Sequence, residues 1–263
     1  MLTLWRKSAT TNRTPKHDLH QPTLREISIV AKELGIETAA LLAVAEIESG
    51  GKSFAVINGR QEPLIRFEAH YFDRRLSGPN RQKARALGLS SPTAGAIANP
   101  KTQSARWKLL AKAAAIDRKA AYESVSWGLG QVMGAHWAWL GYASIDALVD
   151  EARGSVAGQA RLMARFIDRS GLAHALKRRD WEAFARGYNG PAYKRNGYHT
   201  KIAAAYARYT KAAEDGDLDP RAADIRPSIA IPGKAPAANR AGIAAWIRLI
   251  GTIVGLVGSV LRR

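Results

Sequence analysis

Hydrophobic residues occupy nearly every face of one short segment, residues 38–49, whose sequence is TAALLAVAEIES. No Pro or Gly interrupts this run, Thr38 is a suitable N-cap, and Gly50 and Gly51 follow it as a helix stop. A helix that is apolar on nearly all sides is expected in the interior of a domain. The pattern therefore predicts a central buried helix over residues 38–49.

The patterns around this segment predict a mainly helical domain with a small β-hairpin. Thr23 to Glu26 fits a capping box that opens a further helix, and Asn58-Gly59 predicts a tight turn between two short strands. Apolar residues recur with helical spacing in three later segments, residues 67–76, 101–124 and 144–211. Residues 77–100 are rich in Gly, Pro, Ser and Asn and predict a long loop. The expected fold class is mainly α, in an α+β arrangement with a helical shell around the central helix.

Composition divides the chain into four parts. Residues 1–21 are polar and basic and lack the apolar stretch of a signal peptide, so we expect a flexible basic arm. Residues 22–213 are long enough for one globular domain. Residues 214–239 are rich in Pro, Gly and Asp and predict a linker. Residues 240–263 are mostly apolar and predict a separate C-terminal helix.

The charge of the chain limits its partners. The formal charge of +18 and an isoelectric point near 10.5 indicate an anionic partner. The sequence contains no helix-turn-helix signature and no basic and aromatic repeat, so we expect no nucleic acid as a partner. No Cys is present, which excludes disulfides, a thiol nucleophile and a cysteine-bound zinc site. No cluster has the spacing of metal ligands, so we expect no metal and no cofactor.

The C-terminal segment, residues 240–263, has the length and flanks of a membrane-interacting helix. About 20 mostly apolar residues are bounded by Arg at both ends. A narrow polar stripe also suits a helix that lies in the membrane interface; it consists of Arg248, Thr252, Gly255, Ser259 and Arg262. Both arrangements predict contact with an anionic membrane, whereas the Pro-rich linker disfavours a helix buried against the domain.

Two acids near the end of the central helix differ in their direction. Glu46 and Glu48 are two residues apart, about 200° around a helix, so they cannot face the same cleft. Glu48 lies in the last turn, where the helix dipole and partial burial both favour a bound proton. This arrangement suits a general acid, although an acid half-exposed at a helix end is the simpler interpretation of the spacing alone. Ser49 and the two Gly that follow allow a ligand to approach the acid.

Three motifs in order resemble a known superfamily. Glu48-Ser-Gly, Gly128-Leu-Gly-Gln131 and Tyr188-Asn-Gly190 resemble elements of goose-type lysozymes and soluble lytic transglycosylases. Glu48-Ser-Gly-Gly followed by PLIRFEAHYF, residues 63–72, more closely resembles the N-acetylmuramidase family of phage and prophage endolysins, over roughly residues 22–212. One departure is Ala69, where the family pattern Phe-Glu-Arg-His has Arg.

This resemblance implies a lysozyme-like catalytic domain over residues 22–213 that degrades peptidoglycan and lyses bacteria. The Glu that matches Glu48 is the catalytic acid, and the segment that matches Gly128 to Met133 lines the glycan cleft. The pair that matches Tyr188 and Asn189 closes the cleft, although an Asn-Gly turn that ends a helix is the interpretation without the motifs. The implied partners are peptidoglycan glycan strands and, through residues 240–263, an anionic bacterial membrane or lipopolysaccharide.

A second catalytic group is less clearly indicated. Lysozymes that add water need a base or nucleophile opposite the acid. Glu68 is the first candidate and Asp73 the second, and the alternative for both is a carboxylate paired with a neighbouring Arg. His70 is more simply a packed histidine than a ligand. If no group activates water, the muramoyl 6-hydroxyl adds instead, as in a lytic transglycosylase.

The Gly-rich segment contributes further candidate substrate contacts. Gly128 permits close approach of the backbone to a ligand, and Gln131 can both donate to and accept from an N-acetyl group. Trp127 is beside this segment and is expected to stack on a sugar, whereas Trp137 and Trp139 are more simply core residues.

Without a signal peptide, we expect accumulation in the cytoplasm of a bacterial host and action on the periplasmic wall after membrane permeabilisation, with inner-membrane association through the tail as an alternative. The rival from another class is a non-enzymatic, membrane-active cationic protein that acts through its C-terminal helix.

Overall fold

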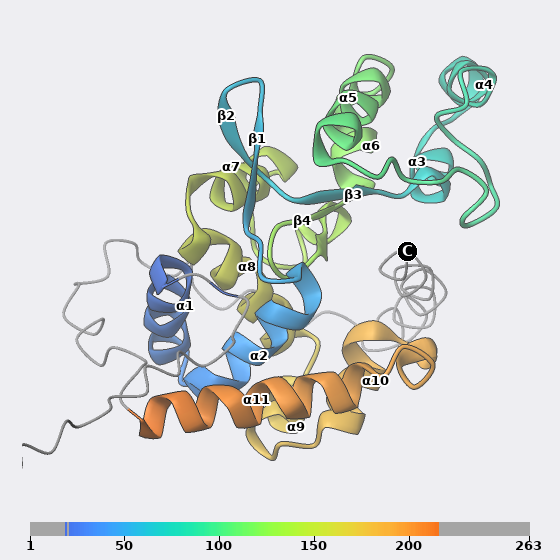
Figure 1. Ribbon diagram of the computed structural model, residues 1–263. Coiled ribbons are helices and arrows are strands. Elements are labelled where there is room, and N and C mark those ends of the chain that lie inside the picture. Colours follow the sequence, from blue (N-terminus) through green and yellow to red (C-terminus); the bar gives the residue numbers. More distant parts are fainter. Residues whose placement is uncertain (1–18, 20, 216–263) are drawn as a thin grey trace, which may run out of the picture.

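The computed structural model describes residue 19 and residues 21–215 of the chain (Figure 1). The helices and strands of this part, in chain order, are α1 (Gln21–Glu33), α2 (Thr38–Ser49), β1 (Phe54–Ile57), β2 (Arg60–Pro63), β3 (Ile65–Phe67), α3 (Ala69–Arg75), α4 (Gly78–Ala86), α5 (Gln103–Ala114), α6 (Arg118–Glu123), β4 (Val125–Trp127), β5 (Val132–Met133), η1 (Gly134–His136), α7 (Ile145–Gly154), α8 (Val156–Arg169), α9 (Ala173–Lys177), α10 (Trp181–Asn189), η2 (Pro191–Tyr193) and α11 (Tyr198–Glu214).

Helix α2 lies in the centre of the domain, as its apolar sequence predicts. All residues from Ala39 to Glu46 are buried, and the helix packs against α1 and α11 (Figure 1). It ends at Gly50, which adopts a left-handed conformation with φ 61° and whose N–H donates to the carbonyl of Glu46. The predicted N-cap is wrong by one residue, because Glu37 occupies that position and Thr38 is the first helical residue.

The hairpin predicted around Asn58-Gly59 is confirmed. Strands β1 and β2 pair antiparallel with Ile57 opposite Arg60, so the two turn residues alone connect them. Asn58 and Gly59 have φ of 50° and 77°, the left-handed values that a tight hairpin turn requires. The hairpin leads directly into β3, and α3 follows β3 in the chain.

A three-stranded antiparallel sheet, in the order β3-β4-β5, lies next to the hairpin. Its strands come from two distant parts of the sequence, because Ile65 pairs with Trp127 and Ser126 pairs with Met133. The pattern of apolar residues did not indicate this sheet, since each strand has only two or three residues. It places the segment after β4 beside the C-terminal end of α2.

Three predicted elements differ from the structure. Helix α1 begins at Gln21, so Thr23 and Glu26 form no capping box; the Glu26 carboxylate accepts from the N–H of Ala157 instead. The predicted loop contains helix α4, with Pro79 in its first turn. The predicted helix over residues 101–124 is two helices, because the Asp117 side chain caps a new helix, α6, by accepting from the N–H of Ala120.

The proposed arm and C-terminal helix, residues 1–21 and 240–263, lie outside the described residues or at their edge, as does most of the linker. Within residues 19 and 21–215, no helix has the length and hydropathy needed to cross a bilayer.

Candidate active site

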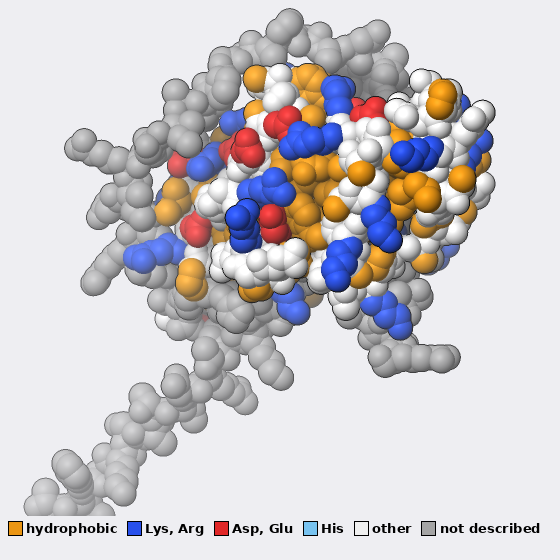
Figure 2. All heavy atoms as spheres, turned by 90° about the horizontal axis from the view of Figure 1, so that it is seen from above, with side chains coloured by type: hydrophobic (Ala, Val, Ile, Leu, Met, Phe, Trp, Pro, Cys, Tyr) orange, Lys and Arg blue, Asp and Glu red, His pale blue; other side chains and the backbone are white. Residues whose placement is uncertain are grey.

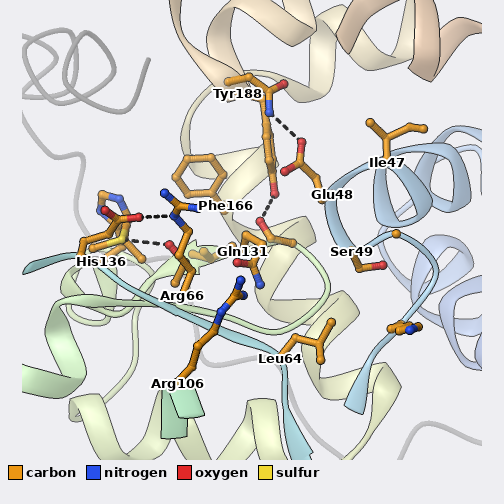
Figure 3. Close-up of a pocket in the computed structure, with 18 of the residues that line it drawn as sticks. Ile47, Glu48, Ser49, Leu64, Arg66, Arg106, Gln131, His136, Phe166 and Tyr188 are labelled. Carbon is orange, nitrogen blue, oxygen red and sulfur yellow. Dashed lines mark hydrogen bonds and ion pairs between the residues drawn. The ribbon is translucent and has the colours of Figure 1, made fainter. Parts of the chain in front are cut away.

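A cleft of about 430 Å³ opens at the C-terminal end of α2. Its walls combine that helix end with β3, the segment from β4 to β5, α5, α10 and the first residue of α11 (Figure 3). Of the residues predicted to form a site, the cleft is lined by Glu48, Ser49, Glu68, Gln131, Met133, Tyr188 and Asn189. The structure therefore brings together residues that are up to 141 positions apart in the chain.

Glu48 and Glu46 point to different sides of α2, as their spacing predicts. The Glu46 carboxylate is buried and is held by two residues of α11: it accepts from Arg208 and, at 2.6 Å, from the hydroxyl of Tyr209. The Glu48 side chain faces the cleft on the opposite side of the helix (Figure 3). The contact between α2 and α11 thus fixes the rotation of the helix that presents Glu48.

The Glu48 carboxyl is poised to hold a proton. Burial raises its pKa from 4.5 to about 7, and a hydrogen bond from Asn189 opposes this rise. In this bond, Nδ2 of Asn189 donates to Oε1 of Glu48 at 2.7 Å. Near neutral pH the carboxyl therefore exists in both protonation states, as a group that gives and takes a proton must.

Asn189 and Tyr188 are the last two residues of α10 and reach the cleft from the side opposite β3. The Tyr188 hydroxyl donates to the carbonyl of Gly130 at 2.7 Å and so joins α10 to the segment between β4 and β5. The Oδ1 of Asn189 is buried and has no hydrogen-bond partner in the structure. A buried acceptor beside Glu48 is suited to a hydroxyl or N–H of a bound ligand.

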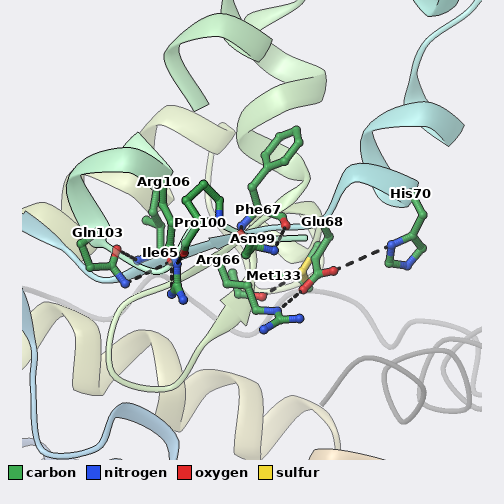
Figure 4. Close-up of polar contacts among 11 residues, drawn as sticks. Ile65, Arg66, Phe67, Glu68, His70, Asn99, Pro100, Gln103, Arg106 and Met133 are labelled. Atoms are coloured by element: carbon green, nitrogen blue, oxygen red, sulfur yellow. Dashed lines mark hydrogen bonds and ion pairs between the residues drawn. The ribbon is translucent and has the colours of Figure 1, made fainter. Parts of the chain in front are cut away.

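Strand β3 forms the wall opposite α10. Ile65 and Phe67 are buried in the core, and the alternation of a strand turns Arg66 to the other face, into the cleft. The Nε of Arg66 donates to Oε1 of Glu68 at 2.7 Å (Figure 4). Burial raises the pKa of Glu68, while the charge of Arg66 opposes this effect.

Two amide side chains hold the outer edge of β3. Asn99 Oδ1 accepts from the N–H of Phe67, and its Nδ2 donates to the carbonyl of the same residue. Gln103 makes the same pair of bonds to Ile65 (Figure 4). These amides replace a neighbouring strand, so the edge of the sheet is satisfied and the direction of Arg66 is fixed.

The other candidates for a second acid or base lie away from the cleft. Asp73 accepts two hydrogen bonds of 2.7 Å from Arg85 and one from Ser90, and the bonds from Arg85 are the main cause of its lowered pKa. His70 is 2% exposed, and its Nδ1 lies 3.8 Å from Oε2 of Glu68. Burial lowers the pKa of His70 to about 4, so it is a neutral, packed histidine near pH 7.

The Gly residues of the β4–β5 segment serve packing more than ligand approach. A Cβ on Gly128 would lie 2.8 Å from the side chain of Gln159, and one on Gly130 would lie 2.6 Å from Met163. Gln159 Oε1 in turn accepts from the N–H of Leu129 at 2.9 Å. The prediction that Gly128 approaches a ligand is therefore wrong, because α8 occupies that space and Gly128 does not line the cleft.

Gln131 lines the cleft in an uncommon backbone conformation. Its φ is 47°, and its Nε2 donates to the carbonyl of Gly128 at 2.8 Å. This bond uses an amide N–H, and its Oε1 remains the group suited to an N-acetyl N–H. Met133 also lines the cleft, and its sulfur accepts from the Ser126 hydroxyl at 3.1 Å.

Trp127 is not a substrate contact. Its side chain is fully buried, does not line the cleft, and donates from Nε1 to the carbonyl of Tyr122 at 3.1 Å. The prediction of sugar stacking is wrong because Trp127 pairs with Ile65 in the sheet and packs against Trp107. Trp137 and Trp139 pack against the core and also lie outside the cleft.

Several cleft residues were not predicted as site residues from the sequence. They are Leu64, Arg66, Gln103, Arg106, His136, Phe166 and Tyr198. The spacing of Arg66 between two apolar residues is compatible with a strand, but only the pairing with β4 shows which face is open. In the part of the chain that the structure describes, no three His, Asp or Glu side chains gather as metal ligands would.

Two comparisons with known proteins give a match, one to a family and one to a solved structure. Residues 37–210 match the model of a family described as Muramidase, N-acetylmuramidase. The chain is also similar to the crystal structure of an endolysin from the Burkholderia AP3 phage, at 34% sequence identity and a TM-score of 0.62, over 77% of this chain and 75% of that chain. A search of curated proteins finds no match. The structural similarity confirms the mainly α, lysozyme-like fold class predicted from the sequence.

Proposed function

The chain belongs to the N-acetylmuramidase family, and on this basis we propose that it is a peptidoglycan-degrading endolysin with Glu48 as its general acid. The bond that it cleaves in this proposal is the β-1,4 bond between N-acetylmuramic acid and N-acetylglucosamine. The observation that carries the proposal is the Glu48 carboxyl, which lies in the cleft with a pKa of about 7 and is oriented by Asn189.

Glu48 acts first in the proposed mechanism. Its carboxyl donates a proton to the oxygen of the leaving sugar while positive charge develops on the ring of the other sugar. Asn189 holds the carboxyl in position through Nδ2, and its unpartnered Oδ1 accepts from a hydroxyl or N–H of the glycan. Tyr188 keeps the β4–β5 segment next to α10. Gln131 of this segment and Ser49 at the end of α2 both line the cleft, and in this proposal they contact the sugars.

Glu68 is the proposed second group. It lies on the cleft wall formed by β3, and its carboxylate would take a proton from the water that attacks the sugar. The hydrogen bond from Arg66 orients the carboxylate. Burial raises the pKa of Glu68, and the positive charge of Arg66 opposes this rise, which favours the ionised carboxylate that a base needs.

The test is digestion of purified peptidoglycan, which contains no membrane. Glu48→Gln keeps the hydrogen bond to Asn189 and removes the proton donor, so we expect a folded protein with no measurable cleavage. Glu46→Gln is the matched control, because it changes an acid of the same helix that faces α11; it should retain cleavage. Full cleavage by Glu48→Gln would refute the proposal.

Mass spectrometry of the products tests the type of reaction. Hydrolysis leaves reducing muramic acid ends, whereas intramolecular attack of the 6-hydroxyl leaves 1,6-anhydro ends. We expect reducing ends, and a product made mostly of 1,6-anhydro ends would assign a lytic transglycosylase instead.

Residues 240–263 support a second, separate proposal that rests on the sequence alone. We propose that this segment binds an anionic bacterial membrane or lipopolysaccharide, and that residues 214–239 link it to the catalytic domain, residues 22–213. Its apolar length and terminal Arg residues support this proposal. Deletion of residues 240–263 should abolish sedimentation with anionic lipid vesicles and leave cleavage of purified peptidoglycan intact. Unchanged sedimentation would refute the membrane proposal.

A further inference from the structure

Two guanidinium groups enter the cleft from neighbouring elements. Arg66 extends from β3 and Arg106 from α5, and both side chains line the cleft near Gln131 (Figure 3). Both are partly buried, so their charges are less screened by water than those of surface residues. Repulsion from Arg66 is one cause of the lowered pKa of Arg106, after burial, which indicates that the two charges are close.

Backbone contacts hold Arg106 in place without neutralising it. Its Nε donates to the carbonyl of Pro100 at 2.9 Å, and its Nη1 donates to the carbonyl of Ile65 at 3.1 Å (Figure 4). These acceptors carry no net charge. Within the described residues, Nη2 of Arg106 and both terminal nitrogens of Arg66 have no hydrogen bond to the protein, so these donors remain for a ligand.

The acids of the cleft do not balance its bases. The basic residues of the lining are Lys52, Arg66 and Arg106, and the acids are Glu48 and Glu68. Burial raises the pKa of Glu48 to about 7, so its negative charge is incomplete near neutral pH. His136 in the lining is neutral, because burial lowers its pKa to about 4. Lys and Arg side chains are also spread over the face shown in Figure 2. The cleft therefore carries an excess of positive charge.

Neutral sugars carry no negative charge that could pair with the basic residues of the cleft. Muramic acid, however, differs from glucosamine by a lactyl group, which bears a carboxylate. We propose that Arg66 and Arg106 bind a carboxylate carried on the muramic acid residue and so select that sugar next to Glu48. This inference rests on the proposed function and adds a recognition site to it. The carboxylate has two sources with the same chemistry: the lactyl group itself in strands without peptide, or the peptide stem attached to it.

Arg106 is the better residue to test, because Arg66 also orients Glu68. Arg106→Gln removes the charge, Arg106→Lys keeps it, and Lys112→Gln removes a charge from an exposed position on the same helix, outside the cleft. Each variant and the unmodified protein are assayed on four substrates: intact peptidoglycan, strands stripped of peptide by an amidase, and each of these two after conversion of its carboxylates to neutral methylamides.

We expect the unmodified protein to cleave a carboxylate substrate about tenfold faster, as kcat/KM, than its methylamide form, since a hydrogen bond to a charged group has about this effect. Arg106→Gln should lose most of this preference, while Arg106→Lys and Lys112→Gln retain it. A preference seen only with intact peptidoglycan assigns the peptide stem, and one seen with stripped strands assigns the lactyl group.

The outcomes separate recognition from folding and from the proposed function. If Arg106 only supports β3, Arg106→Gln slows the cleavage of every substrate equally and keeps the preference, which would overturn the inference. The absence of any preference in the unmodified protein would also overturn it. If neither the unmodified protein nor any variant cleaves any of the substrates, the proposed function is wrong, and this outcome differs from the two above.

Discussion

Substitution of Glu48 by Gln should stabilise the protein at alkaline pH while it abolishes activity. The carboxyl has a pKa of about 7 in the folded protein, against an ordinary value of 4.5. Between these values the folded state binds more protons than the unfolded state, so the free energy of unfolding decreases as the pH rises. Above the folded pKa the loss is complete. Gln does not ionise, so the variant avoids this loss.

The size of the effect follows from the two pKa values. The difference of about 2.5 pH units, at about 1.36 kcal/mol per unit, corresponds to about 3 kcal/mol. By the same relation, the penalty is only about 0.4 kcal/mol at about pH 4.5 and about 3 kcal/mol at about pH 8. Any difference in packing between the Gln amide and the protonated carboxyl is the same at both pH values. The change between the two conditions therefore isolates the cost of ionisation.

Urea denaturation of both proteins at these two pH values measures the effect. The variant should gain about 3 kcal/mol relative to the unmodified protein between the acidic and the alkaline condition. Asp150→Asn, which removes one negative charge from an exposed position on α7, is the control for net charge. A difference in unfolding free energy that does not change with pH would show that Glu48 ionises as a surface acid does, and would remove the physical basis for its role as an acid.

Three further predictions concern residues in the site and next to it. Asn189→Ala removes a hydrogen bond that lowers the pKa of Glu48, so the alkaline limb of the activity profile should move up by about one pH unit, with a lower kcat; an unmoved limb would argue against this coupling. Glu68→Gln should lower kcat about a hundredfold on purified peptidoglycan. The control Asp73→Asn disrupts contacts to Arg85 and Ser90 outside the cleft, so it should lower the free energy of unfolding and leave kcat nearly unchanged. If the two variants lowered kcat equally, Glu68 would have no place in the mechanism. Trp127→Phe should cost about 1–3 kcal/mol of stability, because it removes buried volume and the hydrogen bond to Tyr122, and should leave KM unchanged; a raised KM would restore Trp127 as a sugar contact.

The sequence by itself determined the centre of this fold and the direction of Glu48. An apolar run that ends in two Gly predicted a buried helix that stops at Gly50, and the structure has this helix with Gly50 in a left-handed conformation. The angle between Glu46 and Glu48 on a helix placed them on opposite sides before any partner was known. Asn58-Gly59 determined the hairpin for a similar reason, since few residue pairs adopt two left-handed conformations in succession. All these features depend on residues a few positions apart.

Tertiary structure decided the opposite wall of the cleft. Gln103 contacts Ile65 across 38 residues, and Gln159 contacts Leu129 across 30 residues. The same pairing of distant strands buries Trp127, which its sequence neighbours had suggested as a sugar contact. Local periodicity shows which face of an element is apolar, but it does not show which distant segment covers that face. The direction of Arg66 and the burial of Trp127 follow from the pairing of β3 with β4. They could therefore be predicted only from the tertiary structure.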